Sequence, residues 1–243
     1  MRLDKYICKS TQLSTPQAVE LIQAGKATIN EEVCVFEARQ VHDGNIVKLN
    51  NELLTLRPFR YLMMHKPAGY LCSNKNETHP SLFNILDIDN INVLHIVGRL
   101  DVDTTGLVLI TDDGRWSYNI THPGQDCSKL YRVGLSKPIA TDVIQTFKDG
   151  IMLQGCKELT LPAKLTIMQE KDVRLSITQG KYHQVKRMFK AVGNRVNTLH
   201  REQIGSVRLD IEEGQWRHLT EQEVLSFSKG IENESSVKPL FEC

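Results

Sequence analysis

Two aspartates, Asp101 and Asp103, stand two residues apart in the polar segment Asp-Val-Asp-Thr-Thr-Gly. The apolar run Leu107-Val108-Leu109-Ile110 follows this segment directly. Carboxylates held in a turn can act as general acid, general base or nucleophile, and they can also bind a cation. The pattern therefore predicts acid–base, covalent or metal chemistry at this turn.

A calcium-binding loop is the first interpretation of the turn. Oxygen-bearing side chains alternate through residues 101–105 and Gly106 follows, as in an EF-hand loop. Such a loop should lead into a helix and carry a bidentate Glu at its twelfth position. Residues 107–110 are instead apolar and strand-like, and the twelfth residue is Asp112. We therefore reject the calcium interpretation.

An aspartyl-phosphate phosphatase is the second interpretation, because residues 101–105 match the pattern Asp-x-Asp-x-Thr. In such enzymes the first Asp attacks phosphorus and the second acts as acid and base. That site needs an apolar strand immediately before the first Asp, whereas Gly98 and Arg99 interrupt the strand here. It also needs acidic residues for magnesium, and no later pair stands convincingly at a strand end. The phosphatase remains a minor alternative.

Four further segments accompany the turn: Lys66-Pro67-Ala68-Gly69-Tyr70, Lys129-Leu130-Tyr131-Arg132-Val133, the stretch 180–189 (Gly-Lys-Tyr-His-Gln-Val-Lys-Arg-Met-Phe), and Leu199-His200-Arg201 with Ile204-Gly205. Together with Gly98-Arg99-Leu100-Asp101 and residues 104–114, they resemble the motifs of the RsuA-type family of RNA pseudouridine synthases. The resemblance spans nearly the whole chain in the family's order. On these motifs the chain is identified as a member of that family.

The resemblance implies an isomerisation of uridine that involves no redox change and needs neither a cofactor nor a metal. It implies three catalytic residues, Asp101, Tyr131 and Lys186. Asp101 would attack the ribose or remove its C2′ proton, and the sequence does not choose between these routes. Lys186 would keep the carboxylate ionised. Tyr131 would stack on the uracil ring.

The same resemblance implies residues that bind RNA. Arg99 would help to flip the target nucleotide and Leu199 would pack against its base. Residues 180–201 hold six basic and no acidic side chains in a chain whose net charge is only +1: Lys181, Lys186, Arg187, Lys190, Arg195 and Arg201. Docking of an anion is therefore expected here. RNA phosphate contacts are expected for Lys181, Arg187, Lys190 and Arg195.

The closeness to the RsuA pattern implies 16S rRNA of the small ribosomal subunit as substrate, either as free RNA or within an assembling subunit. A uridine of 23S rRNA is one alternative. A non-catalytic RNA-binding factor of ribosome assembly with the same fold is another. The intact set of Asp101, Tyr131 and Lys186 argues against that binder, which would have no use for it. We expect a monomer.

The composition is that of a globular protein able to bury a core, with 40% hydrophobic and 24% charged residues among 243. No run approaches the roughly 18 apolar residues of a membrane helix, and Asp4 stands where a signal peptide would build its apolar core. The six cysteines include no Cys-x-x-Cys pair, so free thiols are expected. We expect a soluble cytoplasmic protein without membrane contact.

The first part of the chain, residues 1–57, has its own helix and strand signals. Leu3 and Ile7 are spaced as on one face of a short helix, and Ser14-Thr15-Pro16 predicts the start of a second helix. After Gly25, short strands are expected at residues 27–30, 33–36 and 45–49. A polar linker is expected at residues 50–60.

This N-terminal part resembles the S4-type RNA-binding domain, in the segments Arg2-Leu3-Asp4-Lys5-Tyr6 and Ala24-Gly25-Lys26-Ala27-Thr28-Ile29-Asn30. The resemblance implies an RNA-binding domain. Its seven basic and seven acidic side chains cancel, whereas a domain that grips phosphates alone should be more basic. A small folding or orienting module therefore stays an alternative.

Residues 60–230 predict an α+β catalytic domain around a mixed or antiparallel sheet. Apolar runs and period-two alternation predict strands at residues 60–65, 92–97, 107–111, 130–136, 163–168 and 173–178. Helices are expected at residues 114–120, 141–148, 182–192 and 221–228. Residues 231–243 are expected to form a polar tail.

Overall fold

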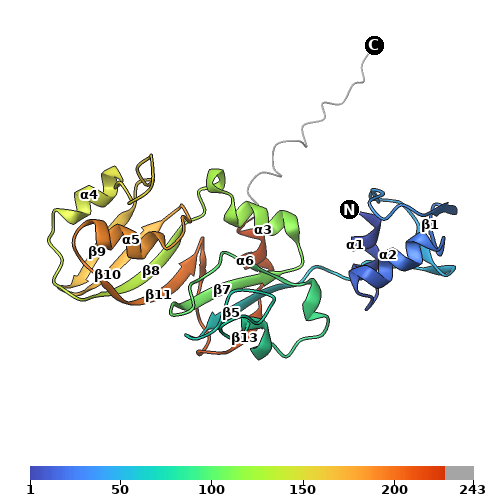
Figure 1. Cartoon of the computed structure of the whole chain (residues 1–243), viewed down its shortest axis with the longest axis horizontal. Coiled ribbons are helices and arrows are strands. Elements are labelled where there is room, and N and C mark those ends of the chain that lie inside the picture. Colours follow the sequence, from blue (N-terminus) through green and yellow to red (C-terminus); the bar gives the residue numbers. More distant parts are fainter. Residues whose placement is uncertain (228–243) are drawn as a thin grey trace, which may run out of the picture. The chain divides into compact units, whose positions relative to one another are not determined.

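The computed structural model describes residues 1–227, which form two compact units (Figure 1). One unit comprises Met1–Phe59 with Ile88–Leu94, and the other comprises Arg60–Asp87 with the described chain from His95 to Phe227. The expected polar tail lies outside the described residues, as does the predicted helix end at residue 228. Within residues 1–227, no helix is long and apolar enough to cross a membrane.

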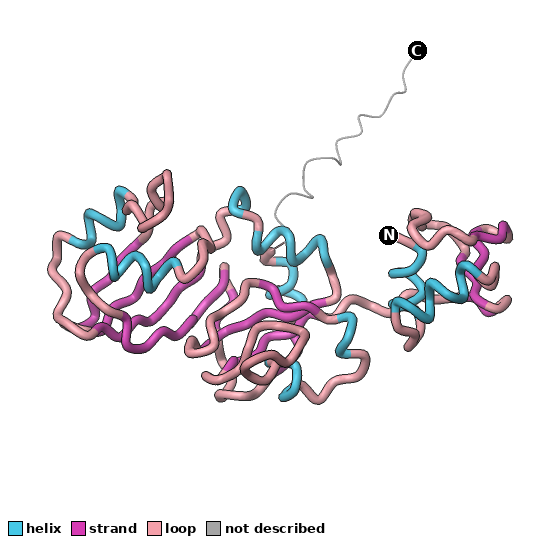
Figure 2. Tube along the Cα trace, in the orientation of Figure 1, coloured by secondary structure: helices cyan, strands magenta, loops and turns pink. Residues whose placement is uncertain are grey.

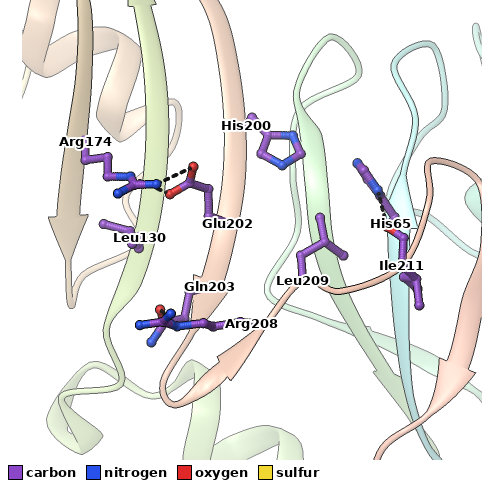
Figure 3. Close-up of a pocket in the computed structure, with 9 residues that line it drawn as sticks. All are labelled: His65, Leu130, Arg174, His200, Glu202, Gln203, Arg208, Leu209 and Ile211. Atoms are coloured by element: carbon purple, nitrogen blue, oxygen red, sulfur yellow. Dashed lines mark hydrogen bonds and ion pairs between the residues drawn. The ribbon is translucent and has the colours of Figure 1, made fainter. Parts of the chain in front are cut away.

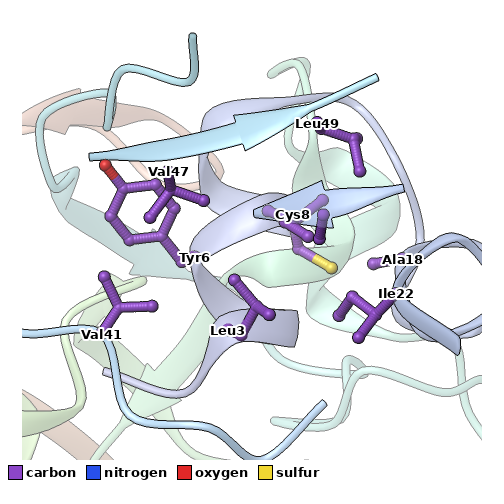
Figure 4. Close-up of a cluster of buried hydrophobic side chains, with 10 residues drawn as sticks. Leu3, Tyr6, Cys8, Ala18, Ile22, Val41, Val47 and Leu49 are labelled. Carbon is purple, nitrogen blue, oxygen red and sulfur yellow. The ribbon is translucent and has the colours of Figure 1, made fainter. Parts of the chain in front are cut away.

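The first unit combines two helices with a small antiparallel sheet. The helices are α1 (Leu3–Ser10) and α2 (Thr15–Gln23). The sheet has the order β2-β1-β3-β4, with the strands β1 (Ala27–Ile29), β2 (Glu32–Cys34), β3 (Val47–Leu49) and β4 (Glu52–Leu53). Side chains from both helices and from the sheet share one core (Figure 4), made of Leu3, Tyr6, Ile7, Cys8, Ala18, Ile22, Ala27, Val41, Val47 and Leu49.

Two tight turns set the strands of this small sheet. Asn30 and Glu31 have φ values of 50° and 69°, and Asn50 and Asn51 have 51° and 67°. Two successive left-handed residues suit the twist of a two-residue hairpin turn, and Asn tolerates them better than most residues. The second turn lets residues 52–53 pair with β3. The expected linker at residues 50–60 is therefore wrong over its first four residues.

The second unit is built on a nine-stranded mixed sheet of order β13-β5-β7-β11-β8-β10-β9, with β6 beside β7 and β12 beside β11. Its strands are β5 (Tyr61–Lys66), β6 (His95–Val97), β7 (Thr105–Thr111), β8 (Lys129–Leu135), β9 (Lys164–Gln169), β10 (Asp172–Ile177), β11 (Val196–Ile204), β12 (Val207–Arg208) and β13 (Trp216–His218). Strands β7 and β11 run parallel, and the other described pairs are antiparallel. Of the two predicted forms, mixed or antiparallel, the sheet is the mixed one.

Four helices accompany this sheet: α3 (Gly114–Thr121), α4 (Val143–Asp149), α5 (Gln184–Ala191) and α6 (Glu221–Leu225). Figure 1 shows α4 and α5 over one half of the sheet and α3 and α6 over the other. The Asp113 side chain accepts the N–H groups of Arg115 and Trp116 and so begins α3, as the sequence predicted. Trp116 packs with Leu107 and Leu109 in one core. This packing makes β7 a buried support for the loop before it.

Several elements differ from the sequence prediction, which also had no strand at β4, β12 or β13. Strand β11 was not predicted, although it joins the two halves of the sheet. The strand expected at residues 92–97 is shorter, because Ile91–Val93 form a turn of 3-10 helix after the left-handed Asn90. Helix α5 begins two residues later than expected, because His183 has a left-handed φ of 47°. The segments that join β5 to β7 are mostly loop (Figure 2).

Candidate active site

The loop between β6 and β7, residues 98–104, forms one wall of a cavity of about 860 Å³. Strand β8 and the segment that leads into α5 contribute other walls. The cavity brings together five residues singled out from the sequence: Arg99, Asp101, Tyr131, Lys181 and Lys186. Leu199 is buried in a smaller cavity of about 90 Å³, which adjoins the first because Asp101, Tyr131 and Lys186 line both.

The buried ammonium of Lys66, the last residue of β5, fixes the backbone of this loop. Its Nζ donates to the carbonyls of Pro67 (2.9 Å), Val102 (3.1 Å) and Thr104 (2.8 Å). The side chain has no exposed surface, and burial lowers its pKa. Three carbonyl acceptors replace the water that the group loses on folding. Lys66 therefore sets the course of the chain on the C-terminal side of Asp101.

One cation joins two carboxylates in the cavity. Lys186 Nζ lies 2.9 Å from Asp101 Oδ2 and 2.6 Å from Asp103 Oδ1. Burial of the ammonium opposes its charge, but the hydrogen bonds and charges of the two carboxylates outweigh burial and raise the pKa of Lys186. The hydrogen bond from Lys186 lowers the pKa of Asp103. A positive charge is therefore held beside both acids, which favours carboxylate chemistry at this point.

His183 contacts the other oxygen of the same carboxylate. Its Nε2 lies 3.3 Å from Asp101 Oδ1, while Lys186 occupies Oδ2. His183 immediately precedes α5, and its backbone is left-handed. Asp101 is thus held between a ring nitrogen and an ammonium, both supplied by the start of α5.

Tyr131 on β8 lies opposite the buried Arg201 of β11 in the sheet register. The Arg201 guanidinium donates to Tyr131 Oη (3.4 Å) and to the carbonyls of Leu107 (2.7 Å) and Gly98 (2.6 Å). Only 2% of the Arg201 surface is exposed. Arg201 was counted in the local charge of residues 180–201 but was not among the residues expected to contact phosphate. The Arg201 guanidinium forms its hydrogen bonds inside the sheet, where it supports Tyr131 and the start of the acidic loop.

The parallel pairing of β7 with β11 depends on a glycine. Gly106 has a φ of 112°, and a Cβ at this position would lie 2.4 Å from the carbonyl oxygen of Arg201. Any larger residue would push the strands apart. The close approach keeps the end of the acidic loop directly beside Arg201.

Comparison with known proteins decides the family. A family model described as RNA pseudouridylate synthase matches residues 60–191, which include the acidic loop, Tyr131 and Lys186. The chain belongs to this family. The ribosomal small subunit pseudouridine synthase A of Vibrio cholerae is 47% identical over 94% of this chain and 100% of its own length. The protein of the same name from Escherichia coli K12 is 44% identical over 93% and 99%.

A solved structure supports the assignment of the chain to this family. The crystal structure of a pseudouridylate synthase matches the chain with a TM-score of 0.69 and 43% sequence identity. The match covers 93% of this chain and 99% of the other. The chain is an RNA pseudouridine synthase over nearly its whole length.

The other basic residues predicted for RNA binding lie outside the cavity lining of the synthase. Arg187 donates to the carbonyls of Tyr182 (3.1 Å) and Gln154 (2.6 Å), so its guanidinium contacts its own chain. Lys190 and Arg195 are exposed. The phosphate contacts of these three residues stay predictions.

Three residues at the site of the synthase were not singled out for the site from the sequence. The resemblance implied no role in the site for Asp103, which stands in the turn with Asp101, and none for His183 or Lys66. Lys66 and His183 lie inside motif segments, and Asp103 lies between two of them, which was the available signal. The spacing of the residues alone did not show that the Lys66 side chain is buried or that His183 lies just before α5 with a left-handed backbone. Within residues 1–227, no group of three or more His, Cys, Asp or Glu side chains is placed to hold a metal ion.

A second cavity of about 400 Å³ is lined by His65, His200 and Glu202 among other residues (Figure 3). His200 and Arg201 are neighbours in β11, so their side chains point to opposite faces of the sheet. His65 and His200 meet there edge to face, with ring centroids 5.2 Å apart. The charges of Arg174 and Glu202 cancel in an ion pair of 2.8 Å. None of the residues predicted for the catalytic site lines this cavity.

Proposed function

We propose that this synthase isomerises a specific uridine of 16S rRNA to pseudouridine. The relatives with 44% and 47% identity are named for the small ribosomal subunit, and they match this chain nearly from end to end. The observation that carries the catalytic part of the proposal is the Asp101–Lys186 pair at 2.9 Å, which shares a cavity with Tyr131.

The reaction exchanges one bond of the ribose for another. The bond from C1′ to N1 breaks, the uracil turns within the cavity, and C5 bonds to the same C1′. The C5 proton is lost and N1 is protonated, so atoms and electrons balance without an oxidant or reductant. The residues must therefore activate the sugar, hold the free base and accept one proton.

Asp101 is the carboxylate that activates the sugar, either by attack at C1′ or by removal of the C2′ proton. Lys186 places a positive charge beside this carboxylate through the 2.9 Å contact. The ring of Tyr131, 8% exposed at the cavity wall, stacks on the uracil. Leu199 packs against the base from the smaller cavity.

The target nucleotide must leave the RNA stack, because C1′ and C5 are not accessible in a stacked, paired uridine. Arg99 is exposed at the rim of the cavity, where it can take the place of the flipped nucleotide or hold its phosphate. Lys181, also in the lining, contacts phosphate, as do Arg187, Lys190 and Arg195 around α5.

The N-terminal unit is proposed as an S4-like RNA-binding domain that adds affinity for the same RNA. Two helices followed by a small sheet suit that role. The enzyme acts as a monomer in the cytoplasm. Free thiols at the five described cysteines suit a reducing compartment.

Tritium release from RNA labelled at uracil C5 tests the proposal, because loss of the C5 hydrogen accompanies the new bond. Labelled 16S rRNA, partly assembled small subunits and 23S rRNA are compared with the same enzyme preparation. Release from small-subunit RNA alone, followed by chemical mapping to one uridine, is the expected result. Release only from 23S rRNA would overturn the substrate assignment, and tight binding without release from any RNA would overturn catalysis in favour of an assembly factor.

A further inference from the structure

Tyr182 is an aromatic side chain left open at the mouth of the catalytic cavity. Its surface is 77% exposed, although it lines the cavity beside Lys181 and Lys186. A large aromatic ring so exposed gains nothing from burial in the folded protein. One of its faces is nevertheless occupied, because it stacks on His183 with ring centroids 3.8 Å apart and planes 19° apart.

The stacked pair connects this open surface to the catalytic carboxylate. His183 Nε2 lies 3.3 Å from Asp101 Oδ1, so the chain of contacts runs from Tyr182 through His183 to Asp101. The backbone of His183 is left-handed, with a φ of 47°. Such a backbone in a residue other than glycine costs free energy and is retained where the surroundings hold it.

The backbone of the pair is braced by α5. Arg187 donates its N–H to the carbonyl of His183 (3.0 Å) and its Nη1 to the carbonyl of Tyr182 (3.1 Å). The rings therefore present a fixed surface. A preformed surface loses little conformational entropy when a ligand stacks on it.

We propose that the outer face of Tyr182 is a stacking platform for the RNA base next to the flipped uridine, and that His183, held by this stack, orients the carboxylate of Asp101. This inference rests on the proposed function and adds a specificity element to it. Tyr182 binds the neighbouring nucleotide, and His183 is a positioning residue that acts through Asp101.

A nucleobase is the occupant that fits the chemistry around the platform. Lys181 lines the same cavity and Lys190 and Arg195 are exposed further along the segment, so a polyanion is attracted to this surface, while the stacking face itself is uncharged. Flipping the target uridine removes the stacking partner of its neighbour. An exposed ring at the cavity mouth replaces that partner, and any of the four bases can use it.

Two substitutions distinguish a loss of base stacking from a loss of folding. Tyr182→Ala removes the ring, and Tyr182→Phe keeps it. Tyr118→Ala is the matched control, because Tyr118 is a 54% exposed tyrosine on α3 that also lies against a histidine ring, but outside the cavity lining. The dissociation constant is measured by fluorescence anisotropy with a 16S rRNA fragment, alongside single-turnover tritium release at saturating enzyme.

The expected result is a dissociation constant about 5-fold to 100-fold higher for Tyr182→Ala. Tyr182→Phe and Tyr118→Ala should bind the RNA like wild type. Removing the base on one side of the mapped uridine should weaken wild type by the same factor and leave Tyr182→Ala unchanged. Three results would overturn the platform. They are equal affinities of Tyr182→Ala and Tyr182→Phe, a loss of affinity in Tyr118→Ala as large as that in Tyr182→Ala, and a loss on removal of the RNA base that is as large in Tyr182→Ala as in wild type.

His183→Asn tests the link to Asp101, since Asn tolerates the left-handed backbone but is too short to reach the carboxylate. Its saturated rate should fall about 10-fold to 100-fold, because a small misplacement of a catalytic group is costly. A wild-type rate would overturn the positioning role. Failure of the proposed function is separate, since wild type would then release no tritium whatever the Tyr182 variants do in binding.

Discussion

Lys186 at the start of α5 donates a hydrogen bond of 2.9 Å to Asp101, which lies 85 residues earlier in the chain. The contact joins the acidic loop before β7 to the basic segment after β10. It brings the two most informative motifs of the sequence into one cavity. The catalytic proposal depends on this pair.

Replacing Lys186 by Gln should lower the saturated rate of tritium release by about 100-fold or more, since the cation beside Asp101 is lost from a site partly shielded from water. Lys190→Gln is the control from the same helix, because Lys190 is exposed and outside the cavity lining. The control should weaken RNA binding modestly and keep the saturated rate. Equal rates for the two variants would contradict the role of Lys186.

The contact between Asp103 and Lys186 should make stability depend on pH. The lowered pKa of Asp103 means that its contribution is present above the ordinary value of 3.8 and is lost as pH falls through the lowered value. The raised pKa of Lys186 means that its contribution is present below 10.5 and is lost as pH rises through the raised value. Asp103→Asn should cost less than about 1 kcal/mol at neutral pH, because the Asp103 side chain is 72% exposed.

Urea unfolding of wild type and Asp103→Asn from neutral to strongly acidic pH measures this dependence. The difference between their free energies of unfolding should shrink to nothing in acid. A difference that stays constant over the whole range would show that the ion pair does not cause it.

Gly106→Ala should destabilise the protein by more than about 2 kcal/mol, because the new Cβ would meet the Arg201 backbone at 2.4 Å and the φ of 112° is unfavourable for alanine. Gly114→Ala is the matched control, since nothing lies within 4 Å of its Cβ position at the start of α3. That change should be neutral or slightly stabilising. Thermal unfolding of both variants checks the prediction, and equal melting temperatures would refute it.

Lys66→Met should destabilise the protein by about 2 to 4 kcal/mol, since it leaves the carbonyls of Val102 and Thr104 without their buried donor. The acidic loop should also lose its fixed backbone, which lowers the saturated rate in molecules that remain folded. Chemical unfolding and single-turnover rates at a temperature where the variant is folded measure the two effects. Wild-type values in both would show that the loop is held by other contacts.

Local signals in the sequence predicted much of the fold. Ser14-Thr15-Pro16 marked the start of α2, and the helix expected at residues 114–120 is α3, which the Asp113 side chain caps. Strand β11 was missed because a buried position of its inward face is taken by Arg201, which breaks the apolar alternation that identifies a strand. The partners that stabilise this arginine come from distant strands, and no local pattern reveals them.

The part of the candidate site that was predictable from the sequence is the set of residues named by the motifs. The resemblance named Asp101, Tyr131 and Lys186, which the cavity brings together. It gave no reason to expect His183 against Asp101, because that contact requires a left-handed residue before α5. Backbone conformation at such a position is set by tertiary contacts rather than by local propensity.

Single-turnover tritium release by wild type and Asp101→Asn, with the dissociation constant of each for the same 16S rRNA, tests the central claim most directly. Asn keeps the size of the side chain and removes its charge. The account predicts unchanged RNA affinity with a rate at least about 100-fold lower for the variant. Release by Asp101→Asn at the wild-type rate would contradict it.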